Sequence, residues 1–291
     1  MRPFRYSNII LVLLLIVLDM AYLAGIVEWW WLLIVFMVYV LLLFLGAINI
    51  QWNFYLRSFN SGNKSKQIAI TFDDGPGKET VAILDILKHQ QVPAAFFTIG
   101  NRAAAQPGIL RRWDDEGHVV GNHSYDHGFN FDWQSAKKMA AEIEKTNELV
   151  TSVIGKTPML FRPPYGITNP NLAKAVKRVG MHSIGWSVRS FDTKTKDPQK
   201  LLNKLLNEIT DGDIVLLHDS MSITREILTK FIEGAKEKGF TFARVDKLLD
   251  LDAYRQGCRI FCIDAIAGFS IGSAEGLSTL EKFSCISSIT G

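Results

Sequence analysis

Hydrophobic residues are arranged in two different patterns along the 291 residues of the chain. Residues 9–50 form an apolar block in which Asp19 and Glu28 are the only charged residues. As a helix, this block would be roughly twice as long as the ~30 Å hydrocarbon core of a bilayer. It therefore predicts two transmembrane helices, about 9–27 and 29–50. The alternative, a signal peptide followed by one span, would require a short apolar region and a small-residue cleavage site, which are not evident.

After this N-terminal anchor (1–57), a polar stretch at 58–66 predicts a linker, and residues 67–252 alternate short apolar runs with amphipathic segments. The apolar runs predict strands at 67–72, 93–99, 118–121, 159–162, 182–187, 213–218 and 240–243. The amphipathic segments predict helices at about 78–90, 107–117, 134–153, 170–179, 198–209 and 224–238. Such alternation predicts a parallel α/β domain, and a doubly wound sheet and a β/α barrel fit it equally well.

Charge and cysteine content exclude some functions. The net charge of +3 is small and spread along the chain, which gives no support for a nucleic-acid partner. No Gly-rich loop opens a predicted helix, which argues against nucleotide binding. The tail at 253–291 contains all three cysteines, Cys258, Cys262 and Cys285, and an odd count confined to a tail predicts no disulfide framework. The tail shows no sustained periodicity, and we assign it no role.

Polar residues that are unusual in an apolar context recur where the predicted strands end. They include Asp73-Asp74 before a Gly-Pro turn, the segment 122–127, Arg162, the segment 186–192 and His218-Asp219. In α/β folds, the loops after the carboxyl ends of the strands form the active site. We therefore expect these groups to meet at one edge of the sheet.

His123 and His127 are four residues apart, so one helical turn would place both imidazoles on one side. Together with one aspartate of the Asp73-Asp74 pair, they would form a set of two histidines and one carboxylate that leaves positions open for water and substrate. Since only one aspartate is needed as a ligand, the other is free to act as a base.

Four motifs occur in the order Thr71-Phe-Asp-Asp-Gly-Pro76, His123-Ser-Tyr-Asp-His127, Arg162-Pro-Pro-Tyr-Gly166 and Leu216-Leu-His-Asp219. In this combination the chain resembles the NodB-type polysaccharide deacetylases, carbohydrate esterase family 4, over roughly residues 66–250. The resemblance implies a distorted (β/α) barrel, here preceded by a two-helix transmembrane hairpin. It also implies metal-dependent removal of acetyl groups from N-acetylated sugars.

By matching positions, the resemblance implies that Asp74, His123 and His127 bind a divalent metal, most commonly zinc. It implies that Asp73 is the general base held by Arg162, that His218 is the general acid, and that the backbone N–H of Tyr165 helps to bind the oxyanion. Trp186 and Leu216 are expected to line the pocket for the acetyl methyl group, although ordinary core packing would also explain them. This chemistry is physically consistent, because a metal polarises the carbonyl and activates water.

The segment after the fifth strand departs from the family pattern, which has an aspartate where this chain has Arg189 and a tryptophan where it has Thr193. In the family, the first acid orients the catalytic histidine. A cation close to His218 would lower the pKa of that imidazole, the wrong direction for a general acid. Either Arg189 turns away and Asp192 or another acid supports His218, or the chemistry is altered.

The expected partners are a glycan bearing N-acetyl groups and a lipid bilayer. Alternatives are another hydrolase of non-peptide C–N bonds and a catalytically silent glycan-binding membrane protein. Lys and Arg residues flank both spans but are missing from the turn between them, which places both ends on the cytoplasmic side of the cell membrane. Known family substrates, chitin and peptidoglycan glycans, usually lie outside, so the sequence leaves the side of the catalytic domain open. A lipid-linked sugar at the cytoplasmic face would satisfy both inferences.

Overall fold

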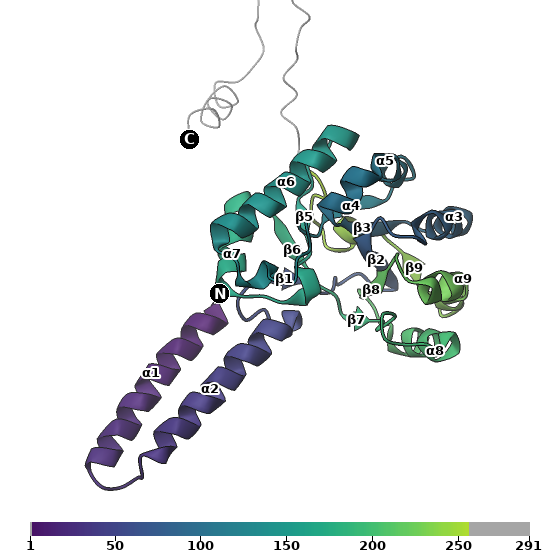
Figure 1. Cartoon of the computed structure of the whole chain (residues 1–291). Coiled ribbons are helices and arrows are strands. Elements are labelled where there is room, and N and C mark those ends of the chain that lie inside the picture. Colours follow the sequence, from purple (N-terminus) through teal and green to yellow (C-terminus); the bar gives the residue numbers. More distant parts are fainter. Residues whose placement is uncertain (1, 256–291) are drawn as a thin grey trace, which may run out of the picture. The chain divides into compact units, whose positions relative to one another are not determined.

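A computed structural model describes residues 2–255 of the chain. Its first two helices are α1 (Arg2–Leu23) and α2 (Trp30–Ile48), which lie side by side (Figure 1). Both are long and apolar enough to cross a bilayer, and their large apolar side chains are mostly exposed. Helix α1 begins several residues before the predicted span. Length and composition alone leave the signal-sequence alternative open.

The last turn of α2 packs against the chain that follows it. Tyr55 donates a hydrogen bond of 3.1 Å from its hydroxyl to the carbonyl of Leu43, and the N–H of Thr168 donates one of 2.9 Å to the carbonyl of Ala47. A Cβ at Gly46 would lie 2.5 Å from Cδ1 of Phe54, so the glycine permits this close approach. The end of α2 is therefore part of the packing of the α/β domain.

The centre of the domain is a parallel sheet (Figure 1). Its strands are β1 (Ser58–Phe59), β2 (Gln67–Gly75), β3 (Ala94–Thr98), β4 (Val119–Asn122), β5 (Leu160–Phe161), β6 (His182–Ile184), β7 (Val188–Arg189), β8 (Ile214–His218) and β9 (Thr241–Phe242). The order is β1-β6-β5-β4-β3-β2-β8-β7, with β9 pairing to the first residues of β2. Within residues 2–255 no pairing joins β7 to β1. The sheet is thus a curled half-barrel, the open form of the predicted distorted barrel.

Helices connect successive strands, as the alternating pattern predicts. They are α3 (Thr80–Gln90), α4 (Gly100–Ala105), α5 (Pro107–Asp115), α6 (Ala136–Ile154), α7 (Pro170–Val179), α8 (Pro198–Glu208), α9 (Ser222–Glu237) and α10 (Val245–Leu248). Three short 3-10 turns are η1 (Ile50–Trp52), η2 (Phe131–Trp133) and η3 (Pro164–Gly166). Asn169 caps α7 and Asp197 caps α8, each side chain accepting a hydrogen bond from a backbone N–H of the first turn. These caps with proline at the first helical position fix where both helices begin.

The main hydrophobic core lies between the strands and the outer helices α3, α5, α8 and α9 (Figure 1). Its centre is a stack of aromatic rings in which Phe96 lies between Phe72 and Trp113, with ring centroids 5.0 and 4.6 Å apart. All three side chains are fully buried. Because this core holds β2, β3 and α5 together, it fixes the position of the end of β2.

Two of the segments predicted along the domain differ from the structure. The segment 58–66, predicted as a linker, contains β1, which pairs with β6, and Ser61 forms a bridge with Asp213. The strand predicted at 182–187 is shorter, since β6 ends at Ile184, and a separate strand β7 follows at Val188; β7 is the last strand of the sheet order, whereas β6 lies next to β1 at the other end. The predictions for the cysteines fall outside the described residues.

Candidate active site

The end of β2 contains a β-bulge that brings two adjacent carboxylates together. Asp73 pairs with Phe97 on one side and His218 on the other, whereas the next residue in register is Gly75, opposite Thr98. Asp74 is the extra residue and has a φ of 67°. Adjacent residues of a regular strand point to opposite faces, and a bulge removes this alternation. Both carboxylates therefore reach the same imidazole, with oxygens 3.9 Å (Asp73) and 3.5 Å (Asp74) from Nε2 of His123.

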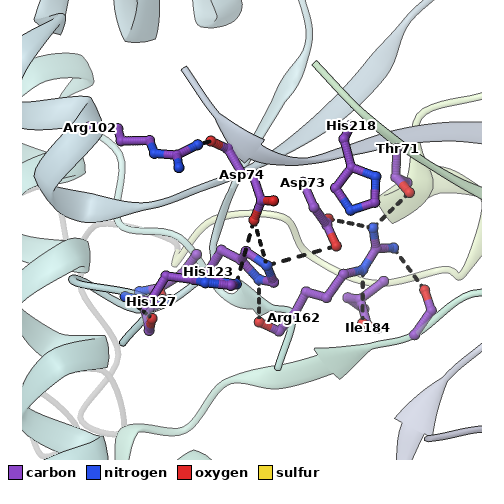
Figure 2. A network of polar contacts seen from close by, with 12 residues as sticks. Thr71, Asp73, Asp74, Arg102, His123, His127, Arg162, Ile184 and His218 are labelled. Carbon is purple, nitrogen blue, oxygen red and sulfur yellow. Dashed lines mark hydrogen bonds and ion pairs between the residues drawn. The ribbon is translucent and has the colours of Figure 1, made fainter. Parts of the chain in front are cut away.

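Asp74, His123 and His127 form a cluster whose ligand atoms all lie within 4.8 Å of one another (Figure 2). Oδ1 of Asp74 is 3.5 Å from Nε2 of each histidine. Nδ1 of His123 is 2.8 Å from the carbonyl oxygen of Arg162. Since a carbonyl only accepts, Nδ1 carries a proton that it donates to Arg162, and Nε2 is the ring nitrogen that faces Asp74. Burial, followed by the neighbouring His123, lowers the pKa of His127 to about 4, so the His127 ring is neutral at neutral pH.

These three residues fit a divalent metal. Two neutral imidazoles and one carboxylate are the donor set that zinc accepts in catalytic sites, where further positions stay open. The prediction that His123 and His127 share a helical turn is wrong, because they lie on a loop in which Ser124 and His127 have φ values of 64° and 51°. The loop is held by local hydrogen bonds, for example from the N–H of Ser124 to Oδ1 of Asn122 at 2.9 Å.

Arg162 follows β5 and fixes the carboxylate of Asp73. Its side chain is fully buried, and Nη1 donates hydrogen bonds of 2.8 Å to Oδ1 of Asp73 and to Oγ1 of Thr71 (Figure 2). The other guanidinium nitrogens donate to the carbonyls of Ile184 and Gly185, at 3.2 and 2.7 Å. A buried cation with this many partners has little freedom, so Asp73 has a single defined orientation with its second oxygen available.

His218, the last residue of β8, is oriented by Asp192. Nδ1 of His218 lies 2.8 Å from Oδ1 of Asp192, whose other oxygen accepts from the N–H of His218 at 2.7 Å and from the hydroxyl of Thr224 at 2.6 Å. Burial lowers the pKa of His218, but the hydrogen bond and the charge of Asp192 outweigh it, with smaller contributions from Asp73 and Asp74, and raise the pKa to about 9. The imidazole is therefore protonated at neutral pH.

This geometry favours the first of the two alternatives for Arg189, in which Arg189 turns away and another acid supports His218. Asp192 supports His218, and the pKa of His218 is shifted upward, opposite to the direction expected from a nearby cation. Arg189 is exposed and lies near two aromatic rings, with Cζ 5.5 Å from the ring centroid of Trp186 and 5.0 Å from that of Phe191. The contribution of Thr224 was not anticipated, because nothing in the sequence distinguishes this residue of α9 from an ordinary buried threonine.

The groups surround a cavity of about 240 Å³. Asp73, Asp74, His123, His127 and His218 line it together with Tyr165, Gly166, Trp186, Arg189, Thr193 and Leu216. Trp186 and Leu216 line the cavity and also belong to a buried hydrophobic cluster, and their contact with an acetyl methyl group stays a prediction. Tyr165 has a φ of 57°, and its ring contacts that of His127 with centroids 4.6 Å apart. The structure brings every predicted site residue except Arg162 and Asp192 to the cavity wall, and those two contact residues that do line it.

Comparisons with known proteins agree with the family resemblance of the four motifs. A sequence model of the family described as polysaccharide deacetylase matches residues 60–184. The peptidoglycan-N-acetylglucosamine deacetylase PgdA of Listeria monocytogenes is 38% identical over 185 residues, which cover 63% of this chain and 39% of PgdA. The chain therefore spans well under half the length of this relative.

Two solved structures are similar over most of their own length. The Bc1960 peptidoglycan N-acetylglucosamine deacetylase has a TM-score of 0.65 and 31% identity, covering 68% of this chain and 94% of Bc1960. BA3943, described as a CE4 family pseudoenzyme from Bacillus anthracis, has a TM-score of 0.63 and 30% identity, covering 67% of this chain and 69% of BA3943. The similar proteins thus include both an enzyme and a protein described as inactive.

Proposed function

This chain belongs to the polysaccharide deacetylase family, and we propose that it is a metal-dependent hydrolase that removes N-acetyl groups from an acetylated amino sugar. The observation that carries the proposal is that the two adjacent aspartates at the β-bulge of β2 have different partners. Asp74 lies with His123 and His127, while Asp73 is held by Arg162. Adjacent carboxylates with different partners are suited to different tasks.

Asp74, His123 and His127 would hold the metal, with zinc as the best match to two imidazoles and one carboxylate. When bound, a divalent metal acts as a Lewis acid toward the amide carbonyl and makes water a stronger nucleophile. Nδ1 of His123 donates to the carbonyl of Arg162, which orients the ring for this role.

The chain's own residues supply the proton transfers. Asp73 takes a proton from the attacking water as a C–O bond forms at the acetyl carbon. The backbone N–H of Tyr165 is proposed to donate to the oxyanion that develops on the carbonyl oxygen. His218 then gives its proton to the amide nitrogen as the C–N bond breaks, so the products are acetate and a free amine. Because the pKa of His218 is raised to about 9, the proton is in place at neutral pH.

A glycan-binding protein without activity is the second candidate, and the similarity to BA3943 is the observation that favours it. Against it stands the complete set of predicted groups around one cavity. Another C–N hydrolase would use the same groups, and only the choice of substrate separates it from the leading proposal.

We also propose that α1 and α2 form a transmembrane hairpin that anchors the domain. The contacts of Leu43, Gly46 and Ala47 with the domain support this, since a removable signal sequence has no need to pack against the mature protein. The positive residues at both ends favour the cytoplasmic side for the domain. Protease access to the domain in intact cells would test this side.

The activity is tested by incubating the full-length, zinc-loaded protein with N-acetylglucosamine oligomers and measuring acetate and free amine. We expect both products in equal amounts, with loss of activity after removal of the metal by a chelator and recovery on its return. A folded, metal-loaded protein that binds oligomers and releases no acetate would instead support the binding protein. Release of acetate without a matching amine would exclude amide hydrolysis.

A further inference from the structure

Arg189 is an exposed cation at the mouth of the catalytic cavity. Its guanidinium packs near the rings of Trp186 and Phe191, and within residues 2–255 it forms no ion pair with a carboxylate. Contact with two aromatic rings restricts an arginine side chain while its N–H donors remain free to bind an anion. A cation held in this way beside a reaction site is suited to binding an anionic group of the substrate.

A second cavity of about 330 Å³ adjoins the catalytic one. The two share Trp186 and Arg189 as lining residues. The rest of the second cavity is formed by Phe191 and by the end of α2 with η1, including Leu45, Ile48, Ile50 and Trp52. Nε2 of Gln51 donates a hydrogen bond of 2.9 Å to the carbonyl of Trp186, which fastens η1 to the wall that separates the two cavities. This second, largely apolar cavity, called the groove below, therefore lies beside the reaction site and at the end of a proposed transmembrane helix.

Four exposed aromatic side chains of the domain line one of the two cavities or contact a residue that does. Within residues 49–255, the exposed large hydrophobic residues are Trp52, Val81, Phe129, Trp133, Tyr165 and Phe191. All except Val81 are aromatic, and Tyr165 lines the catalytic cavity while its ring contacts that of Phe129. Trp52 and Phe191 line the second cavity. Exposed aromatic residues are enriched where membrane proteins meet the lipid headgroups, so Trp52, Phe129, Tyr165 and Phe191 suit a mouth that faces the bilayer surface.

We propose that the substrate is an amino sugar linked through phosphate to a lipid of the bilayer that holds α1 and α2. Arg189 binds the phosphate, the groove along η1 and the end of α2 takes the first part of the lipid chain, and the sugar's N-acetyl group enters the cavity between Asp73 and His218. The inference rests on the proposed deacetylase activity and on the proposed anchor, and it adds the substrate class. Charge complementarity at Arg189 and the apolar groove together favour a lipid phosphate over a neutral polymer.

The test uses the full-length, zinc-loaded protein in phospholipid vesicles and three substrates. These are N-acetylglucosamine linked by phosphate to a polyprenol, soluble N-acetylglucosamine 1-phosphate, and the neutral tetramer of N-acetylglucosamine. We expect the highest kcat/KM for the lipid-linked sugar. Arg189→Gln should lower that value by about tenfold to a hundredfold, the range for a hydrogen bond to a charged group, mainly through KM. The same substitution should change the value for the neutral tetramer by a much smaller factor.

Two variants make the result specific. Arg189→Lys keeps the charge and should recover part of the lost kcat/KM. Arg111→Gln removes an exposed arginine of α5, away from both cavities, and should leave all three substrates within about twofold. Equal loss on all three substrates with Arg189→Gln would overturn phosphate binding. Equal kcat/KM for the free sugar phosphate and the lipid-linked sugar would overturn binding of the lipid chain. Absence of acetate from every substrate would overturn the proposed activity itself. This outcome can be told apart from the two that overturn phosphate or lipid binding.

Discussion

Replacing Asp192 by asparagine should change the pH dependence of the reaction far more than its maximum rate. Asp192 is fully buried, and its two oxygens accept hydrogen bonds from Nδ1 and N of His218 and from Thr224. The substitution keeps the size of the side chain but removes the charge that stabilises the protonated imidazole. What remains is the burial of His218, which lowers its pKa.

The size of the effect follows from the two pKa values of His218. With Asp192 in place the pKa is about 9, and without it we expect a value no higher than the ordinary 6.5. At pH 8 the protonated fraction then falls from ~0.9 to ~0.03 or less, so the rate should drop at least about 30-fold. At pH 6 an imidazole with a pKa of 6.5 is still ~0.8 protonated, so the loss of rate should be more than about tenfold smaller there than at pH 8.

The assay is acetate release across pH 5.5–9.5 at constant metal loading, with the wild type and Asp192→Asn compared at each pH. Asp115→Asn, which changes an exposed aspartate at the end of α5, is the matched control and should reproduce the wild-type profile. In the plot of rate against pH, we expect the decline on the basic side to move to lower pH by two units or more. An equal loss of rate at every pH would refute the reasoning, because it would show a general structural defect and no change in the acidity of His218.

Three further predictions concern packing and stability. Phe96→Ala should lower the free energy of unfolding by about 3–5 kcal/mol, measured by denaturant titration, because Phe96 is fully buried between Phe72 and Trp113; a loss below about 1 kcal/mol would contradict the stack. Gly166→Ala should raise KM, since a Cβ there would collide with the ring of Trp186 at the cavity wall and the glycine has a φ of 71°; an unchanged KM would show that Trp186 does not shape the pocket. Burial lowers the pKa of His118 to about 4, so the folded state keeps this ring neutral while the unfolded chain takes up a proton below about 6.5. The free energy of unfolding should therefore fall as the pH drops from 6.5 toward 4. His118→Gln should remove part of this pH dependence of stability.

The sequence predicted the order of elements well because the physical causes are local. Alternating apolar runs and amphipathic segments indicated a parallel α/β domain, and Asn169-Pro170 and Asp197-Pro198 marked the starts of two helices. Strand β1 was missed because its two residues lie in a polar stretch and owe their conformation to pairing with β6. The division between β6 and β7 was also invisible, since it depends on which neighbouring strand each one pairs with.

The candidate site was predicted in its residues and less well in its contacts. Motif positions named Asp73, Asp74 and His218, but the β-bulge that turns both aspartates toward His123 appears only in the register of β2 with its neighbours. The position of Arg189 was interpreted from its place in the chain alone, which suggested a cation beside His218. In the structure, Asp192 holds the histidine, because the chain after β7 turns at Phe191, whose φ is 60°.

The central claim is that Asp73 and Asp74 have separate tasks, and one measurement tests it directly. Asp73→Asn and Asp74→Asn are prepared in parallel, and bound zinc per chain is measured after gel filtration together with acetate release. We predict that Asp73→Asn keeps its zinc and loses about 10²–10⁴-fold in rate, the usual contribution of a general base. Asp74→Asn should lose zinc and regain part of its rate at high zinc concentration. Loss of zinc from both variants alike, or normal turnover by Asp73→Asn, would contradict the account.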